Sequence, residues 1–273
     1  MGKYNDIDLQ EWRNYTDVKT DSLWLFDRRD NSGLHDGFYH GNFIPQVPFQ
    51  LMQRYTKRED WILDPFAGSG TTLIEASRTG RNSVGVELQE EVAEDTFKRI
   101  KKPDISYAHS TVICGDSSTV DLKPVCDMYG FDKFQFFIYH PPYWDIIKFS
   151  DNRDDLSNCD TLDAFLDRFG QVIDNTAQYL EEDRYCALVI GDKYENGKVV
   201  PLGFKCMELF IQRDFLLKAI IVKNIGETKG KAQSHGLWRY RALANDFYVF
   251  GHEYVFVFRK KEDNYARDKE KTR

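Results

Sequence analysis

The sequence has no run of about 20 consecutive apolar residues, so no segment is long enough for a membrane helix. No signal peptide precedes Trp12. The five cysteines are scattered without Cys-x-x-Cys spacing, which argues against a structural zinc site and favours buried thiols in a reducing compartment. These absences predict a cytoplasmic protein that uses neither a membrane nor a metal.

A net positive charge is also missing, since 37 Lys and Arg stand against 44 Asp and Glu, a net charge of −7. Binding to phosphates depends on local basic clusters rather than on the total charge, so the acidic balance does not exclude a nucleic-acid partner. Each cluster could equally be ordinary solvated surface. The clusters are Arg28-Arg29, Arg54 with Lys57-Arg58, residues 223–231, and Arg239 with Arg241.

From Trp61 onwards, apolar segments alternate regularly with amphipathic ones. This alternation predicts an α/β fold with a mostly parallel, seven-stranded, doubly wound sheet whose last two strands form a hairpin-like pair. Residues 1–40 are polar, aromatic and irregular, and we expect them to pack on the main body through Trp12, Tyr15, Trp24 and Phe26. The expected strands are residues 61–66, 83–88, 111–114, 134–139, 185–190, 216–222 and 252–259, and the expected helices are residues 71–79, 90–101, 162–180 and 204–213.

The most informative segment, which we call the glycine loop, is Asp64-Pro65-Phe66-Ala67-Gly68-Ser69-Gly70-Thr71-Thr72. It follows an apolar run and opens a helix-forming stretch, and its glycines let the backbone approach a bound small molecule closely. A Walker-type phosphate loop is excluded because no Gly-Lys-Ser/Thr follows. A nicotinamide enzyme fits less well because Gly-x-Gly-x-x-Gly is absent.

A second segment, the HPPY motif, is His140-Pro141-Pro142-Tyr143, directly after the strand expected at residues 134–139. Ligands of open parallel sheets bind at the carboxyl ends of the strands, where both segments are expected to lie. A Pro-Pro turn alone is structural in most proteins. Its position after a strand, together with the glycine loop, favours a functional role.

The two segments together resemble those of the S-adenosylmethionine-dependent DNA amino-methyltransferases, which methylate N6 of adenine or N4 of cytosine. The glycine loop matches closely, whereas the HPPY motif departs at His140, where that family usually has Asp, Asn or Ser. The resemblance covers roughly residues 40–260. It implies a Rossmann-like class I methyltransferase domain over residues 41–260, a charged tail at 261–273, S-adenosylmethionine as cofactor and double-stranded DNA with a flipped base as partner. The sequence contains no Pro-Cys dipeptide, which argues against the covalent cysteine route of cytosine-C5 methylation.

The resemblance also implies a set of cofactor residues. The glycine loop would wrap the methionine part, Glu87 would accept hydrogen bonds from ribose hydroxyls, and Asp116 would bind the adenine amino group. Either carboxylate alone could be a surface group at a strand end, but their joint spacing from the loop favours cofactor contact. The remaining implied cofactor residues are Phe43, Pro45, Leu88 and Ser117.

An exocyclic amine is a weak nucleophile, so the site must accept its N–H protons while holding it in line with the methyl group. Paired prolines fix the backbone and donate no N–H, so we assign the acceptor role to the Pro141 carbonyl together with the His140 side chain. Tyr143 would stack on the flipped base, and Trp144 could extend the stacking wall or merely pack. No enzyme nucleophile is required, so catalysis rests on orientation and electrostatics.

His140 brings a pH hypothesis, because a neutral imidazole accepts one hydrogen bond and an imidazolium accepts none. Activity should fall as the pH drops through the pKa of His140, and a flat rate between about pH 8 and about pH 5.5 would contradict this hypothesis. In the alternative, His140 points away and backbone carbonyls alone serve.

Two segments are candidates for target recognition, residues 145–160 and the basic, aromatic loop at residues 226–245. The second could also be a mobile surface loop, and the acidic residues 151–155 are expected to be solvated surface or a helix start. Two rival functions stay open: methylation of an RNA base, and a catalytically inactive binding subunit. A homodimer or a restriction-system partner is also possible. The residues of the second segment predicted to bind nucleic acid are Lys229, Lys231, Arg239 and Arg241.

Overall fold

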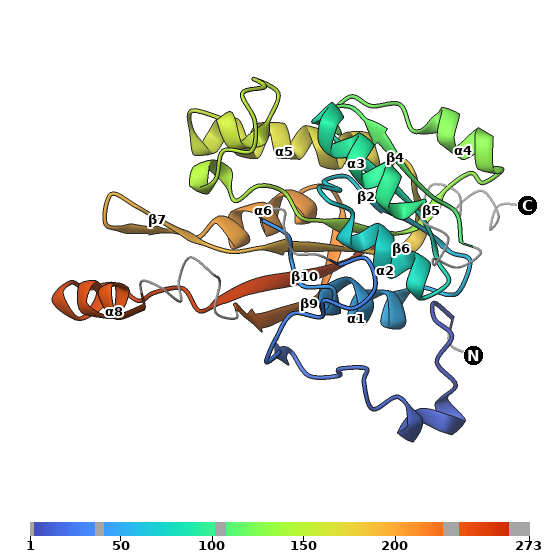
Figure 1. The fold of residues 1–273 in the computed structure, drawn as a ribbon, viewed down its shortest axis with the longest axis horizontal. Coiled ribbons are helices and arrows are strands. Elements are labelled where there is room, and N and C mark those ends of the chain that lie inside the picture. Colours follow the sequence, from blue (N-terminus) through green and yellow to red (C-terminus); the bar gives the residue numbers. More distant parts are fainter. Residues whose placement is uncertain (1–2, 36–40, 102–107, 226–234, 262–273) are drawn as a thin grey trace, which may run out of the picture.

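The computed structural model describes residues 3–35, 41–101, 108–225 and 235–261 (Figure 1). Eight strands form the central sheet in the spatial order β1-β9-β10-β6-β5-β2-β3-β4, and a separate hairpin pairs β7 with β8. In the central sheet β10 is antiparallel to both of its neighbours, and the other paired strands are parallel. The strands are β1 (Leu23–Trp24), β2 (Trp61–Asp64), β3 (Asn82–Glu87), β4 (Ser110–Cys114), β5 (Phe134–Tyr139), β6 (Leu180–Ile190), β7 (Lys193–Glu195), β8 (Lys198–Val200), β9 (Phe215–Asn224) and β10 (His252–Lys260).

The predicted mostly parallel, doubly wound sheet is confirmed, with one strand more than expected. The additional strand is β1, which pairs with β9 at the sheet edge and lies in the segment expected to be irregular. A strand of two residues shows no period-2 pattern, so the sequence gives no signal for it. The helix expected at residues 162–180 ends earlier, at Ala177, because β6 already begins at Leu180.

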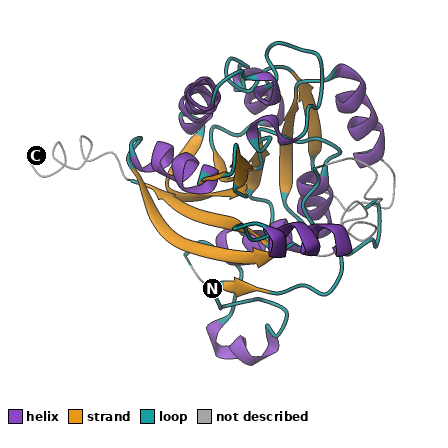
Figure 2. Ribbon diagram, turned by 90° about the vertical axis from the view of Figure 1, so that its left-hand side faces the viewer, coloured by secondary structure: helices purple, strands orange, loops and turns teal. Residues whose placement is uncertain are grey.

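Helices cover both faces of the sheet (Figure 2). Successive side chains of β5 point to opposite faces, so Phe136 and Ile138 pack in one cluster, while Phe137 and Tyr139 pack in the other. The first face carries α1 (Gln46–Tyr55), α2 (Thr71–Arg78) and α3 (Glu90–Ile100), and the second carries α4 (Lys123–Tyr129), α5 (Leu162–Ala177) and α6 (Leu202–Ile211). Short 3₁₀ helices and a further helix complete the described chain: η1 (Leu9–Asn14), η2 (Trp144–Ile146), η3 (Leu156–Asn158) and α8 (His235–Ala244).

The N-terminal extension packs on the core, but not through all of the expected aromatics. Trp24 is buried, whereas Trp12 is 58% exposed on η1, so the expectation for Trp12 was wrong. Within the described ranges, no helix is both long and apolar enough to cross a membrane. Cys126, Cys186 and Cys206 are buried free thiols, as expected.

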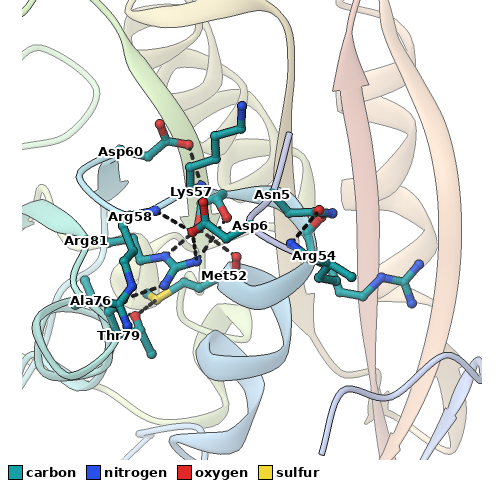
Figure 3. Close-up of polar contacts among 12 residues, drawn as sticks. Asn5, Asp6, Met52, Arg54, Lys57, Arg58, Asp60, Ala76, Thr79 and Arg81 are labelled. Atoms are coloured by element: carbon teal, nitrogen blue, oxygen red, sulfur yellow. Dashed lines mark hydrogen bonds and ion pairs between the residues drawn. The ribbon is translucent and has the colours of Figure 1, made fainter. Parts of the chain in front are cut away.

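A polar cluster joins the extension to the C-terminal ends of α1 and α2 (Figure 3). Arg81 is 3% exposed, and its guanidinium donates to the Thr56 carbonyl at 3.0 Å, to the Thr56 hydroxyl at 3.1 Å and to the Thr79 carbonyl. It also lies 3.3 Å from the Asp6 carboxylate, which accepts the Arg58 backbone N–H at 2.7 Å. Arg81 therefore connects the extension to the ends of α1 and α2.

Replacing Arg81 by alanine is expected to lower the free energy of unfolding by about 2 to 3 kcal/mol, because buried carbonyls would lose their donors. Chemical denaturation measures this change. Arg58→Ala is the matched control, since Arg58 reaches Asp6 through its backbone N–H, and it should change stability by less than about 0.5 kcal/mol. Equal effects of the two substitutions would contradict the structural role given to Arg81.

Candidate active site

The glycine loop joins the end of β2 to the start of α2, and its backbone requires glycine. Gly70 has a φ of +82°, in the left-handed region, and a Cβ there would lie 2.7 Å from Thr96 Cγ2 on α3. The Thr96 hydroxyl donates to the Gly68 carbonyl at 2.8 Å, which holds the loop against α3. The loop thus brings its backbone and the N-terminus of α2 to the carboxyl edge of the sheet.

Asp64, the last residue of β2, is buried and organises this loop. One carboxylate oxygen accepts the Phe66 N–H at 2.9 Å, and the other accepts the Thr72 hydroxyl. Burial raises the pKa of Asp64 to about 6, and the charge of Glu87 adds to this rise, while the two hydrogen bonds oppose it. The loop is therefore built around a carboxylate that is costly to keep charged.

Glu87, the last residue of β3, is the second buried carboxylate beside the loop. Its two oxygens accept the backbone N–H groups of Gly68 and Gln89, both at 2.9 Å. Burial raises its pKa as well. Among the described residues, no cationic side chain forms an ion pair with Asp64 or Glu87. The charge at this edge of the sheet is thus negative and suits a cationic ligand.

The residues after β4 lie against the same loop. The Ser117 hydroxyl donates to the Pro65 carbonyl at 2.6 Å. Asp116 accepts the Ser118 N–H at 2.8 Å, and its other oxygen lies 3.6 Å from the Arg168 guanidinium on α5. Arg168 cannot be predicted from the sequence, because nothing in the sequence indicates which face of the helix meets the end of β4.

Residues 41–45 connect the glycine loop to the HPPY motif. The Asn42 amide donates to the Ser69 hydroxyl at 2.6 Å, and the Phe43 ring lies 4.6 Å from the His140 ring. Phe43 is 6% exposed, and Pro45 is buried at the start of α1. Leu88, the remaining predicted cofactor residue, is partly buried after β3. The structure therefore brings the predicted cofactor segment and the first residue of the HPPY motif into direct contact.

The HPPY motif begins directly after β5, which is the neighbour of β2 in the sheet. Pro141 is buried, and its carbonyl accepts no hydrogen bond from the described residues. Pro142 is partly buried. The Pro141 oxygen therefore keeps acceptor capacity that no described donor uses.

His140 and Tyr143 belong to a chain of polar contacts that continues into β10 and β9. The Tyr143 hydroxyl lies 3.4 Å from His140 Nε2 and donates to a Glu253 carboxylate oxygen at 2.7 Å. The other Glu253 oxygen accepts from Lys223 at 2.6 Å. Burial lowers the pKa of His140 to about 4; the Lys223 charge acts in the same direction, and the Glu253 charge opposes it. His140 is therefore neutral at physiological pH.

Trp144 packs inside the protein. It is 4% exposed, its indole N–H donates to the Cys159 carbonyl at 2.8 Å, and Lys193 Nζ lies 3.9 Å from its ring centroid. Of its two predicted roles, packing is the one that this burial supports. The side chain of Asp155 is also buried and caps η3, so the segment at residues 145–160 is ordered by its own hydrogen bonds.

The predicted basic loop differs from expectation. Residues 235–244 form α8 rather than a loop, and Figure 1 shows this helix standing away from the sheet beyond β7. Arg239 and Arg241 are exposed on α8, while Lys229 and Lys231 lie outside the described residues, as does the predicted tail beyond Lys261. Lys223, which the sequence places in the basic cluster at residues 223–231, is 4% exposed and paired with Glu253. Only the strand register reveals this pair.

The described residues contain no group of three or more His, Cys, Asp or Glu that could hold a metal ion.

A family-model comparison matches residues 3–98 and 134–273 to N6/N4-type DNA methylases. Type II methyltransferase M.MthZI of Methanothermobacter thermautotrophicus is 34% identical over 88 residues, 32% of this chain and 24% of that protein. Type II methyltransferase M2.DpnII of Streptococcus pneumoniae is 40% identical over 65 residues, 22% of this chain and 24% of that protein. The similarity thus spans about a quarter of each relative's length.

Solved structures share the fold. TrmN from Thermus thermophilus has a TM-score of 0.52 and 16% identity, covering 81% of this chain and 50% of that one. A SAM-dependent methyltransferase from Methanosarcina mazei has a TM-score of 0.52 and 12% identity, covering 78% and 98%. At such identities the likeness shows the fold, a Rossmann-like methyltransferase sheet. Because the family model matches well over half of the residues, the chain belongs to the N6/N4 DNA methylase family.

Proposed function

We propose that this protein transfers a methyl group from S-adenosylmethionine to the exocyclic amino group of an adenine or cytosine flipped out of DNA. The observation that carries this proposal is the proximity of the glycine loop and the HPPY motif, which Asn42 and Phe43 connect through Ser69 and His140. The two motif regions lie at the ends of the neighbouring strands β2 and β5, and Phe43 packs on His140 between them. A methyl donor held by the glycine loop would thus sit beside the HPPY motif.

The charges beside the loop support this choice of cofactor. S-adenosylmethionine carries an ammonium and a sulfonium, and Asp64 and Glu87 are buried carboxylates without a cationic side-chain partner in the described chain. The cofactor, when bound, supplies an electrophilic methyl group. The glycine loop would hold its methionine part, Glu87 its ribose and Asp116 its adenine.

The HPPY motif supplies acceptors for the amine. The Pro141 carbonyl and the neutral His140 ring would each accept an amine N–H, which leaves the nitrogen lone pair free to attack. The Tyr143 ring, partly exposed beside His140, would stack on the flipped base. These residues orient the amine and stabilise the charge that develops on it.

The pH dependence follows from the lowered pKa of His140. With a pKa of about 4, the ring stays neutral well below neutrality, so the methyl-transfer rate should be flat from about pH 8 to about pH 5.5. The hypothesis from the sequence placed the loss within that window, and burial moves it to lower pH. Single-turnover rates across this range measure the effect, and a half-maximal rate near pH 6.5 would contradict a neutral His140.

We propose that α8 contacts DNA, because Arg239 and Arg241 are exposed on it and can pair with phosphates. Replacing Arg239 and Arg241 by alanine should weaken DNA binding roughly 10-fold and leave the cofactor Kd unchanged. Fluorescence anisotropy with labelled DNA measures this. Lys98→Ala is the control, because Lys98 is an exposed lysine on α3. Equal losses of DNA and cofactor binding would mean that α8 is structural.

The decisive experiment incubates the protein with labelled S-adenosylmethionine and a mixture of DNA and RNA, followed by nucleoside mass spectrometry. We expect N6-methyladenine or N4-methylcytosine in the DNA, and the identity of the product settles which base is used. Label in RNA alone would support the RNA methyltransferase, and no product with intact cofactor binding would support an inactive binding subunit.

A further inference from the structure

Lys223 and Glu253 form a charged pair on β9 and β10, and Glu253 also contacts Tyr143 of the HPPY motif. Lys223 and Glu253 are register partners in β9 and β10, one residue inside the ends of the strands that enclose residues 225–251. Lys223 is 4% exposed and Glu253 is 8% exposed, and their charged atoms are 2.6 Å apart. A charge pair this deeply buried is costly to desolvate, so it calls for an explanation beyond stability.

The pair fixes the chemical form of Glu253. Burial acts to raise its pKa, but the Lys223 ammonium, with further help from the Tyr143 hydroxyl, holds that pKa below its usual range. Glu253 is therefore a carboxylate, which accepts hydrogen bonds and donates none. The 2.7 Å contact with Tyr143 consequently commits the tyrosine proton to Glu253.

This commitment decides what Tyr143 can offer to His140. A hydroxyl has a single proton, so the Tyr143 oxygen can meet His140 Nε2 only as an acceptor. At 3.4 Å the contact is at the long limit of a hydrogen bond, and the one hydrogen bond that these two groups can form has Nε2–H as its donor. The neutral ring then carries its proton on Nε2 and leaves Nδ1 as its acceptor.

The position of the Tyr143 ring is constrained by its neighbours. A Cβ on Gly191, which follows β6, would lie 3.0 Å from Tyr143 Cε2, so the ring lies close against glycine backbone. The ring also meets His140 edge-on at 5.7 Å. Tyr143 thus has one well-defined position from which its oxygen can face His140.

We propose that Glu253, held by Lys223, is a positioning residue that acts through the Tyr143 hydroxyl to select the Nε2–H tautomer of His140, so that Nδ1 is the atom that accepts the amine N–H of the substrate. The choice of tautomer is inferred from the contacts of Tyr143 with Glu253 and His140. Its catalytic meaning rests on the proposed methyl-transfer function.

Nitrogen-15 NMR of histidine-labelled protein at about pH 7 tests the tautomer without substrate. The His140 signals are assigned from their loss in His140→Gln. We expect a single Nε2–H tautomer in the wild-type protein. In Glu253→Gln the amide can donate to the Tyr143 oxygen, which frees the hydroxyl proton for Nε2, so the Nδ1–H form should gain roughly 5- to 10-fold in relative population.

In Tyr143→Phe the phenyl ring keeps its position but has no oxygen to accept from Nε2–H. His140 should therefore no longer show a single Nε2–H tautomer. The double variant Lys223→Met with Glu253→Gln removes both charges together, so it leaves no unpaired buried lysine if the single variant folds poorly. Glu181→Gln, at a half-exposed site on β6, is the matched control and should leave the tautomer unchanged. An Nδ1–H tautomer in the wild-type protein, or the same tautomer in every variant, would overturn the proposal.

Measurement of kcat tests the positioning role of Glu253 separately from the tautomer. Glu253→Gln should lower kcat roughly 10- to 100-fold without changing the cofactor Kd, as is typical when a group that orients a functional imidazole is lost. A changed tautomer with unchanged kcat would refute the positioning role. If the wild-type protein transfers no methyl group at all, the proposed function fails, while the NMR result still decides the tautomer.

Discussion

His140→Ala is expected to lower kcat by about 100-fold or more, the scale of losing a group that takes part in proton transfer or accepts a reacting proton. The variant keeps the Pro141 carbonyl but removes the one side-chain acceptor at the start of the HPPY motif. It also removes the ring that packs on Phe43. Single-turnover methyl transfer at saturating cofactor and DNA measures the change.

Two companion substitutions sharpen this result. His140→Asn provides a neutral acceptor, as the native ring does, and should retain activity within about 10-fold of wild type. His140→Asp would place a second carboxylate near Glu253, and the repulsion between them should keep its activity below that of the asparagine variant. Wild-type kcat in His140→Ala would show that backbone carbonyls suffice and that His140 points away from the substrate.

Asp64→Asn is expected to weaken cofactor binding about 10- to 100-fold, since a buried carboxylate that we propose to face the cationic cofactor would become neutral. The same change should stabilise the ligand-free protein at pH 7. The folded pKa of Asp64 is about 6 and its unfolded value is 3.8, so the folded state binds the proton more tightly. The charged group therefore opposes folding above about pH 6, by about 3 kcal/mol, and this opposition fades as the pH falls toward 4.

Isothermal titration calorimetry measures the cofactor Kd, and thermal unfolding at pH 7 and pH 5 measures stability. The rise in Tm of the variant over wild type should be larger at pH 7 than at pH 5. Asn can keep the hydrogen bond from the Phe66 N–H and can donate to the Thr72 hydroxyl, so the loop itself should survive. Weaker cofactor binding together with a lower Tm would instead mean that the loop has collapsed.

The sequence predicted the elements whose patterns are local. All seven expected strands are present, because apolar runs such as Phe134–Tyr139 are bounded by turn residues. The glycine loop was predictable because Gly70 adopts a backbone conformation that other residues reach only with strain. By contrast, β1 is too short to show a period, and α8 follows a segment in which glycine and basic residues suggested a loop.

The candidate site also contains residues that the sequence predicts and residues that only the structure reveals. Asp64, Glu87, Asp116 and the HPPY motif could be named in advance, because parallel strands bring their carboxyl ends to one edge. The Lys223–Glu253 pair could not, since lysine and glutamate in a sequence normally indicate solvent. Burial of this pair depends on register between two strands that are distant in the chain.

The sequence by itself determined the family, the fold class and the two motif regions at the strand ends. Each of these depends on residue types at short, fixed spacings. The tertiary structure alone decided that Trp144 packs inside, that His140 is held neutral, and that Glu253 reaches it through Tyr143. These outcomes depend on burial and on contacts between distant segments, because desolvation and pairing fix the protonation state of a side chain and its sequence neighbours do not.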